Sequence, residues 1–405
     1  MSYRALWQNR DFRLLFTASI GTNLGDGVLS VALPWLATLL TRDPMLIGLV
    51  ASARGMPWLV FTLPVGVVTD RFDRRRLILL ADGLRLALVA AVALLAVAAE
   101  PGTPAILALV GLTFVLGSVE VLRDNTAQSV LPLVVDPDHL ELANGQMWSA
   151  EELSGRFIGP PLAGAMIALW VAFPFGFFSA MMLISLIFVS RLRLKQENRA
   201  APAAFISALG EGLRYLNGRP ELRRLAGVLG AFNFLYYMSA AVLVLFAQEI
   251  LGLGAMGYGA LLSAQAVGGL LGSLMGPWLI GRLGPSRSLI FGMIGFICVS
   301  ACMALNAPLW VIVPLLVLDG FTGMIWNITT VSYRQRTIPS QMFGRVNAAY
   351  RFFGSGTMPL GAFAGGAIVA SAAPMGQAAL HLPFALAAVG ALGMMAYAMR
   401  RLRIG

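Results

Sequence analysis

Gly66-Val-Val-Thr-Asp70-Arg71-Phe-Asp73-Arg74-Arg75-Arg76 is the stretch of this sequence that decides the fold. It carries two acidic side chains and four arginines between two long apolar runs, in a chain of 405 residues of which only 12% are charged. Charge of this density is too costly to lie in hydrocarbon. The stretch therefore predicts a tight turn at a membrane surface between two spanning helices.

Composition places the whole chain in the same class. Apolar residues make up 58% of the sequence, well above their share in soluble domains, and a spanning helix needs about 20 of them in a row. Twelve apolar segments are long enough, centred near residues 26, 57, 87, 114, 156, 181, 236, 269, 296, 321, 358 and 391. The first run is too long for the apolar part of a signal peptide, so we expect it to be helix one. The predicted fold class is an all-α integral membrane protein with 12 transmembrane helices.

The net charge of +10 raises the question of a nucleic-acid partner, and the distribution of the charges argues against one. With an internal N-terminus, most of the 29 lysines and arginines fall in or beside cytoplasmic segments, which is the positive-inside pattern. We therefore expect a multi-pass protein of the bacterial inner membrane with both termini in the cytoplasm. Basic residues of the central loop are expected to attract anionic lipid headgroups: Arg191, Arg193, Lys195, Arg199, Arg214 and Arg219.

The chain divides into two halves of six helices each. We expect an N-terminal bundle over residues 1–195, a cytoplasmic linker loop over 196–219 and a C-terminal bundle over 220–405. Arg10-Asp-Phe-Arg-Leu-Leu before helix one corresponds to Pro220-Glu-Leu-Arg-Arg-Leu before helix seven, which places Asn23 opposite Asn233. Such repeats predict a pseudo-two-fold axis along the membrane normal, a substrate cavity between the halves, and alternating access by rocking of the halves.

The charged stretch at 66–76 also resembles the signature loop of the major facilitator superfamily, which has a glycine, Asp-Arg four residues on, and a basic cluster between helices two and three. In the second half, Gly281-Arg282-Leu-Gly284-Pro285-Ser-Arg287 keeps the turn and two arginines but lacks the acid. The resemblance covers the whole chain. It implies the major facilitator fold of two pseudo-symmetric six-helix bundles.

This resemblance gives the charged turn a role in gating. It implies that Asp70, at the end of helix two, sits against the positive N-terminal end of helix eleven near residues 343–345 and holds the cytoplasmic side closed. It also implies that Arg71 pairs with Glu120 or Asp124 near the end of helix four. The alternative is a charged turn that only sets topology. The candidate gating residues are Gly66, Asp70, Arg71, Asp73, Arg74, Arg75, Glu120 and Asp124.

The fifth helix reads Gly155-Arg156-Phe-Ile-Gly159-Pro160-Pro161-Leu-Ala163-Gly164. Its small residues form a flat face that lets another helix approach closely, and its prolines remove backbone donors and bend the helix. The run resembles the antiporter motif of superfamily exporters, Gly-x-x-x-Gly-Pro-x-x-Gly-Gly, with Ala163 for one glycine and an extra proline. In those exporters this face seals against helix eight, here around residues 268–272; generic helix packing is the alternative. The candidate antiporter residues are Gly155, Gly159, Pro160 and Gly164.

Ionisable side chains inside the helices are costly, so each is a functional candidate. Asp26 near the middle of helix one has no charged partner close by in the sequence, and Asp319 lies similarly in helix ten. Glu152 shares a helix face with Arg156 at i, i+4, and a purely structural reading of this pair stays open. The candidates for proton coupling are Asp26, Glu151, Glu152 and Asp319, and the candidate charge partners within the helices are Arg54, Arg156 and Arg351.

Polar and aromatic side chains of the helices are candidates to line an apolar substrate cavity, and lipid-facing belts or core packing are the alternative. These candidates are Asn23, Trp35, Trp58, Phe232, Asn233, Tyr236, Tyr237 and Trp326. The two cysteines, Cys298 and Cys302, share a helix face at i, i+4 and are expected to be buried, inert thiols.

The run Gly25-Asp26-Gly-Val-Leu-Ser-Val-Ala-Leu-Pro34-Trp35, together with the charged turn, is similar to the superfamily branch of enterobactin-type siderophore exporters and macrolide or multidrug efflux pumps. That resemblance implies a monomeric, proton-coupled exporter of amphiphilic small molecules such as drugs or siderophores. An uptake symporter or facilitator of the same fold is the alternative. We expect no cofactor, no metal and no enzyme activity, because the two histidines, His139 and His381, lie far apart and no nucleophile–base pair is evident.

Overall fold

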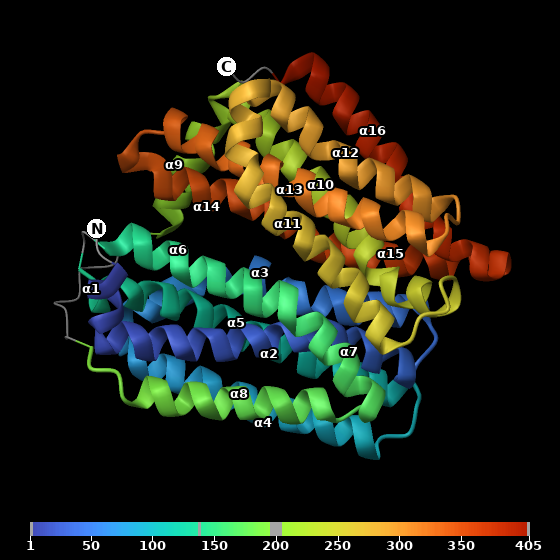
Figure 1. Ribbon diagram of the computed structural model, residues 1–405, viewed down its shortest axis with the longest axis horizontal. Coiled ribbons are helices and arrows are strands. Elements are labelled where there is room, and N and C mark those ends of the chain that lie inside the picture. The colour runs from blue at the N-terminus through green and yellow to red at the C-terminus, as the bar shows by residue number, and fades with distance from the viewer. Residues whose placement is uncertain (1–2, 137–138, 195–204, 403–405) are drawn as a thin grey trace. The chain divides into compact units, whose positions relative to one another are not determined.

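Figure 1 shows the computed structural model, which describes residues 3–136, 139–194 and 205–402. Every regular element within these ranges is a helix. The chain divides into two compact units. The N-terminal unit comprises Met1–Thr41, Ala53–Pro202 and Gly254–Ala260, and the C-terminal unit comprises Arg42–Ser52, Ala203–Leu253 and Leu261–Gly405. Each unit therefore includes a short piece of chain from the other half of the sequence.

The N-terminal unit is built mainly on long helices. They are α2 (Arg10–Leu40), most of α3 (Pro44–Arg71), α4 (Arg74–Ala98), α5 (Thr103–Val134) and α8 (Phe173–Ser190), preceded by the short α1 (Tyr3–Gln8). Between α5 and α8 the chain forms α6 (Leu140–Glu151), the π-helical η2 (Glu152–Ile158) and α7 (Gly159–Leu169). Helix α8 packs against both α2 and α4, and α4 also packs against α5 (Figure 1). Side chains on α2, α4, α5 and α8 therefore meet in the interior of this unit.

The C-terminal unit repeats this plan with its own helices. They are α9 (Phe205–Asn217), α10 (Pro220–Glu249), most of α11 (Ala255–Leu283), α12 (Pro285–Ala304), α13 (Leu309–Thr337), α14 (Ser340–Gly356), α15 (Met358–Ser371), the 3₁₀ segment η3 (Ala373–His381) and α16 (Leu382–Arg401). Helix α12 packs along α13 and α16, and α10 packs along α15 and α16. Helix α9 packs on α14, so residues 205–217 of the expected linker loop form a helix; residues 196–204 lie outside the described ranges.

Eleven helices of the described ranges are long and apolar enough to cross a membrane. The segment expected as helix five is not among them, because η2 interrupts it between α6 and α7. Pro160 and Pro161 have no backbone N–H, so two α-helical hydrogen bonds are lost. The backbone N–H of Gly159 bonds instead to the carbonyl oxygen of Ser154, five residues earlier, which is the π-helical pattern.

The charged stretch at 66–76 forms the turn between α3 and α4. Helix α3 ends at Arg71, and Asp73 caps α4, since its Oδ1 accepts a hydrogen bond of 2.8 Å from the backbone N–H of Arg76. The turn between α11 and α12 passes through Gly284, whose φ of +76° favours glycine. Both connections are only a few residues long. The Asp73 cap starts α4 directly after α3, and Gly284 lets the chain turn directly from α11 into α12.

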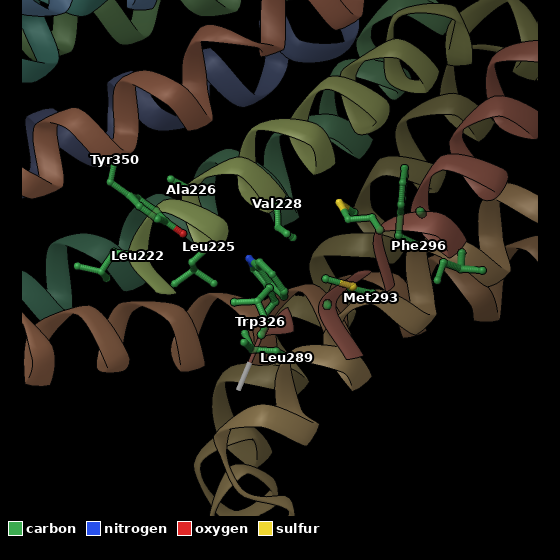
Figure 2. Packing of buried hydrophobic residues seen from close by; sticks show 14 of the residues in the cluster. Leu222, Leu225, Ala226, Val228, Leu289, Met293, Phe296, Trp326 and Tyr350 are labelled. Carbon is green, nitrogen blue, oxygen red and sulfur yellow. The ribbon is translucent and has the colours of Figure 1, made fainter. Parts of the chain in front are cut away.

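Each unit has an apolar core of its own. In the C-terminal unit, Leu225 of α10, Met293 and Phe296 of α12 and Trp326 of α13 pack together (Figure 2). In the N-terminal unit the core includes Phe12, Leu15, Ile78, Val130 and Val189. The polar side chains of the candidate site lie on the same helices that supply these cores.

Candidate functional site

Asp26 forms an ion pair with Arg85 inside the N-terminal unit. Its Oδ1 accepts a hydrogen bond from Nη2 of Arg85, which lies on α4. The Arg85 side chain is fully buried, whereas 19% of the Asp26 side chain is exposed. The ring of Phe178 on α8 lies 5.1 Å from the guanidinium carbon. Gly25 leaves room for this ring, because a Cβ atom on Gly25 would lie 2.9 Å from Cδ2 of Phe178.

A second buried ion pair begins three residues earlier on α4. Nε of Arg123 on α5 lies 3.6 Å from Oδ1 of Asp82, and the Ser185 hydroxyl on α8 donates a hydrogen bond of 2.6 Å to Oδ2 of Asp82. The Asp82 and Arg123 side chains are both buried. Nη1 of Arg123 also lies 3.5 Å from Oδ1 of Asp124. This pair connects α4, α5 and α8 and gives the Arg123 charge a counter-charge inside the bundle.

Glu120 completes what we call the carboxylate cluster of the N-terminal unit. This half-buried side chain interacts electrostatically with Asp26, Arg54, Arg85 and Asp124. It lies near the middle of α5, which continues to Val134, and not near the helix end as expected for a partner of Arg71. The cluster is defined by the carboxyl groups of Asp26, Asp82, Glu120 and Asp124 and the guanidinium groups of Arg54, Arg85 and Arg123.

The charged residues of helix five lie close to this cluster, and Glu151 and Arg156 are exposed. Nε of Arg156 lies 3.4 Å from Oε1 of Glu152, with 68% of the Arg156 side chain exposed. Such an exposed pair contributes little to stability. Glu151 ends α6, is exposed, and interacts electrostatically with Asp124 and Asp26. The candidate coupling acids of helices one and five therefore share one region of the N-terminal unit.

The glycines of the fifth helix face two different neighbours. A Cβ atom on Gly159 would lie 2.6 Å from Cα of Gly27 on α2, and one on Gly155 would lie 3.2 Å from the Asn23 carbonyl oxygen. A Cβ atom on Gly164 would lie 2.6 Å from the carbonyl oxygen of Ala255, in the first residue of α11. Helix five therefore touches helix eight (α11) through Gly164, whereas Gly155 and Gly159 make room for helix one (α2).

The partner expected for this face, residues 268–272, packs elsewhere. A Cβ atom on Gly272 would lie 2.7 Å from the carbonyl oxygen of Phe321 on α13, and Gly268 faces Val317 of the same helix. Within the N-terminal unit, helix five contacts the first residues of α11, where Gly259 lies against the carbonyl oxygen of Pro160. The seal expected around residues 268–272 stays a prediction.

In the C-terminal unit, Asp319 lies at one end of a chain of hydrogen bonds. Its Oδ2 accepts a bond of 2.6 Å from Nε2 of Gln265 on α11. The Gln265 Oε1 accepts a bond of 3.0 Å from the Tyr236 hydroxyl on α10. Asp319 is only 5% exposed. Neutral partners rather than a cation surround this carboxyl group in the part of the chain that the structure describes.

The aromatic candidates of the C-terminal unit pack around this chain of bonds. Phe232 stacks on Tyr236 and on Trp326, with ring centroids 6.4 and 6.5 Å apart, and Tyr237 packs edge-on against Tyr236. Trp326 is 7% exposed and belongs to the core shown in Figure 2. Asn233 donates a hydrogen bond of 2.8 Å to the carbonyl oxygen of Gly354. Core packing therefore accounts for Trp326, and the half-buried rings are the better cavity candidates.

The remaining described candidates differ in their contacts and in their exposure. Trp35 packs against Tyr258 within the N-terminal unit, with ring centroids 6.4 Å apart, and Trp58 is half-buried on α3. Arg75 donates a hydrogen bond to the carbonyl oxygen of Ser190 at the end of α8. Arg71 is exposed, and Gly66 and Arg74 are half-buried. The side chains of Asp70 and Arg351 lie outside the described part of the structure.

Sequence reasoning missed five residues of these clusters as candidates. Asp82, Arg85 and Arg123 lie in apolar runs, and the rule that singled out Asp26 would have found them. Ser185 and Gln265 carry no charge, so no signal of that kind marks them. Among the described residues, no group of three or more His, Cys, Asp or Glu side chains is placed to hold a metal ion.

Solved structures with the same arrangement of helices define the class. A variant of the nucleoside transporter NupG superposes with a TM-score of 0.77 at 13% identity, covering 98% of this chain and 100% of that one. A bacterial homologue of the lysosomal transporter Spinster gives a TM-score of 0.75 at 14% identity, covering 96% of each chain. The chain therefore has the fold of these transporter structures over nearly its whole length, which confirms the predicted fold class.

The family follows from the sequence match. Residues 2–403 match the model of the transmembrane secretion effector family, MFS_3, and the chain belongs to this family of membrane transporters rather than to an enzyme family. It is 28% identical to the multidrug efflux pump Tap of Mycolicibacterium fortuitum over 423 residues, or 96% of each chain. It is 26% identical to the enterobactin exporter EntS of Salmonella typhi, over 84% of this chain and 81% of that one.

A shorter match is found with the multidrug efflux pump Tap of Mycobacterium tuberculosis strain H37Rv, at 29% identity over 253 residues. It spans 57% of this chain and 57% of that pump, little more than half of its length. All of these relatives are distant homologues of this chain. Together with the family match, they indicate that this protein transports small molecules.

Proposed function

We propose that this protein is a proton-coupled exporter of amphiphilic small molecules that works by alternating access. The observation that carries the proposal is the carboxylate cluster. It holds four carboxyl groups against three guanidinium groups. An uncompensated charge inside a membrane helix bundle is costly, so four carboxyl groups facing three guanidinium groups leave one negative charge for a proton to neutralise. The cluster is therefore a place where one proton is held and released.

The carboxyl groups of the cluster differ in burial, and we assign them different roles on that basis. Asp82 is fully buried, forms an ion pair with Arg123 and accepts a hydrogen bond from Ser185, which makes it a structural counter-charge. Asp26 is 19% exposed and Glu120 is half-buried, so these two side chains are less enclosed than that of Asp82. We propose that Asp26 and Glu120 exchange the proton and that the fixed positive charge of Arg85 links the two sites.

The relatives support the direction and the class of the cargo. Tap is named a multidrug efflux pump and EntS an enterobactin exporter, and both fit a flux of drug-like or siderophore-like compounds out of the cell. The half-buried rings of Phe232, Tyr236 and Tyr237 beside Asp319 supply an apolar surface with one acid, which suits an amphiphilic or cationic compound. In this proposal the protein lies in the bacterial cell membrane with both termini in the cytoplasm.

Transport into inside-out vesicles with an imposed pH gradient tests the proposal. The panel contains a siderophore and several lipophilic drugs, and the wild type is expected to accumulate at least one of them only when the gradient is present. Glu120→Gln is expected to abolish gradient-driven accumulation while exchange of substrate across the membrane without a gradient continues. Glu100→Gln, an exposed acid between α4 and α5, is the matched control and should behave as wild type.

Other outcomes discriminate between the alternatives. Equal wild-type transport with and without the gradient identifies a facilitator, and accumulation only in the opposite orientation identifies an uptake symporter. Gradient-driven accumulation that survives in Glu120→Gln removes Glu120 from coupling and leaves Asp26, Glu151, Glu152 and Asp319 as the acids to test.

A further inference from the structure

A groove lies between α10 and α16 of the C-terminal unit, at the end where α10 begins and α16 ends. Its volume is about 440 Å³. Arg223 and Arg224 line one part of it, Val228 and Met394 form a buried floor, and Tyr397 stands at its side, 44% exposed. Gly227 and Ala231 also line it, and their small size leaves the space open. The groove is thus cationic at one end and apolar along its length.

The cationic end lies at the level of the helix ends. Nη1 of Arg223 donates a hydrogen bond of 3.2 Å to the carbonyl oxygen of Asn217, just before α10. Nη1 of Arg224 donates one of 3.0 Å to the carbonyl oxygen of Arg401, the last residue of α16. These bonds hold both guanidinium groups near the ends of two spanning helices, which is the headgroup region of a bilayer.

The apolar part of the groove runs from there toward the bilayer interior. From Arg224 to Ala231 the helix rises by about 10 Å, the depth of the upper part of an acyl chain. Further along α16, Leu386, which lies eleven residues before Tyr397 and therefore on the same helix face, is an exposed apolar side chain, as expected for a surface in contact with lipid. A molecule with an anionic head and a long apolar tail is complementary to both parts.

We infer that this groove binds one anionic phospholipid. The phosphodiester lies against Arg223 and Arg224, which are preorganised donors for phosphate oxygens, and the Tyr397 hydroxyl is a third donor. One acyl chain lies over Gly227 and Ala231. Zwitterionic lipid is disfavoured because its amine adds a positive charge near the arginines. This site is independent of the proposed substrate and of proton coupling.

Native mass spectrometry of the purified full-length protein in detergent tests the inference. Phosphatidylglycerol and phosphatidylethanolamine of equal chain length are the probes, and the anionic lipid is expected to bind more tightly. Arg223→Gln/Arg224→Gln is expected to weaken phosphatidylglycerol binding about tenfold, or about 1.4 kcal/mol. Arg10→Gln/Arg13→Gln is the matched control, because it removes two exposed arginines from the corresponding segment of the first half. It should leave binding unchanged.

A second variant separates the groove from general electrostatic attraction. Ala231→Leu keeps every charge and fills the apolar part, so it is expected to weaken phosphatidylglycerol binding while glycerol phosphate, which has no acyl chain, still competes as for wild type. Equal losses in both arginine double variants, or unchanged lipid binding in Ala231→Leu, would overturn the inference. If Arg223→Gln/Arg224→Gln does not fold, Ala231→Leu and Arg223→Gln alone decide it by the same criteria.

Discussion

Replacing Asp26 by asparagine tests how strongly the buried Arg85 depends on its partner. The change keeps the size of the side chain and removes its charge, so the fully buried guanidinium loses its nearest counter-charge. Removing one partner of a buried ion pair costs about 3–5 kcal/mol. We expect the lower end, about 3 kcal/mol, because 19% of the Asp26 side chain is exposed and Glu120 also interacts with Arg85.

Thermal unfolding of the purified protein in detergent, followed by tryptophan fluorescence, measures this loss. For a unit of about 200 residues, 1 kcal/mol corresponds to about 2–4 °C, so the midpoint of Asp26→Asn is expected to fall by about 6–12 °C. In Asp26→Asn/Arg85→Met both charges are removed. Because replacing a buried pair by apolar groups is often neutral, that midpoint should return close to the wild-type value.

The control is Asp136→Asn, which neutralises an exposed acid just beyond α5 and should not shift the midpoint. A wild-type midpoint for Asp26→Asn would refute the reasoning, since Arg85 would then be stabilised by other groups. So would a double variant that is as unstable as the single one, because the loss would then come from packing rather than from the unpaired charge.

Two further changes probe helix five. Gly164→Leu places a bulky side chain against the backbone of Ala255 and should lower the free energy of unfolding by about 1–3 kcal/mol. The control Gly176→Leu, at a glycine with open space around it, should lower it little. Equal losses in the two variants would exclude close packing as the cause. Glu152→Gln breaks an exposed i, i+4 pair and should change stability by about 0.5 kcal/mol or less, so a loss of gradient-driven transport at an unchanged melting midpoint would assign Glu152 to coupling.

The fold could be predicted because membrane physics leaves few alternatives. A charged stretch between two long apolar runs has to be a turn at the surface, and α3 and α4 do end and begin within it, at Arg71 and Arg74. The break in helix five was foreseen only as a bend. The N–H of Gly159 bonds to the carbonyl oxygen of Ser154 because of the way helix five packs against α2. Sequence spacing does not predict that packing.

The candidate site could be predicted only residue by residue. Asp26 stands out because an acid in an apolar run is costly, yet its partner Arg85 lies 59 positions away and becomes its neighbour only through the packing of α2, α4 and α8. Asp319 was found by the same rule, but its partner Gln265 is neutral and gives no such signal. Glycine spacing predicted a close helix contact for Gly159, and Gly159 does lie against Gly27 of α2; the spacing alone does not name the partner helix, because several helices in such bundles offer small residues.

The two units place different chemistry at corresponding positions. The register that aligns Asn23 with Asn233 also aligns Asp26 with Tyr236. Helices α4 and α12 begin at Arg74 and Pro285. When these two starts are aligned, Arg85 corresponds to Phe296. The Asp26–Arg85 ion pair therefore corresponds to a contact between the rings of Tyr236 and Phe296, whose centroids are 6.0 Å apart.

One structural contact is thus charged in the N-terminal unit and aromatic in the C-terminal unit. A charged pair responds to a proton, whereas two rings respond to an apolar or cationic molecule. This difference is the physical basis for proposing that the first half of the chain handles the proton and the second half recognises the cargo. Coupling would then consist of each ligand favouring a different state of the same two-unit fold, since a ligand shifts such an equilibrium only by the difference in its affinity for the two states.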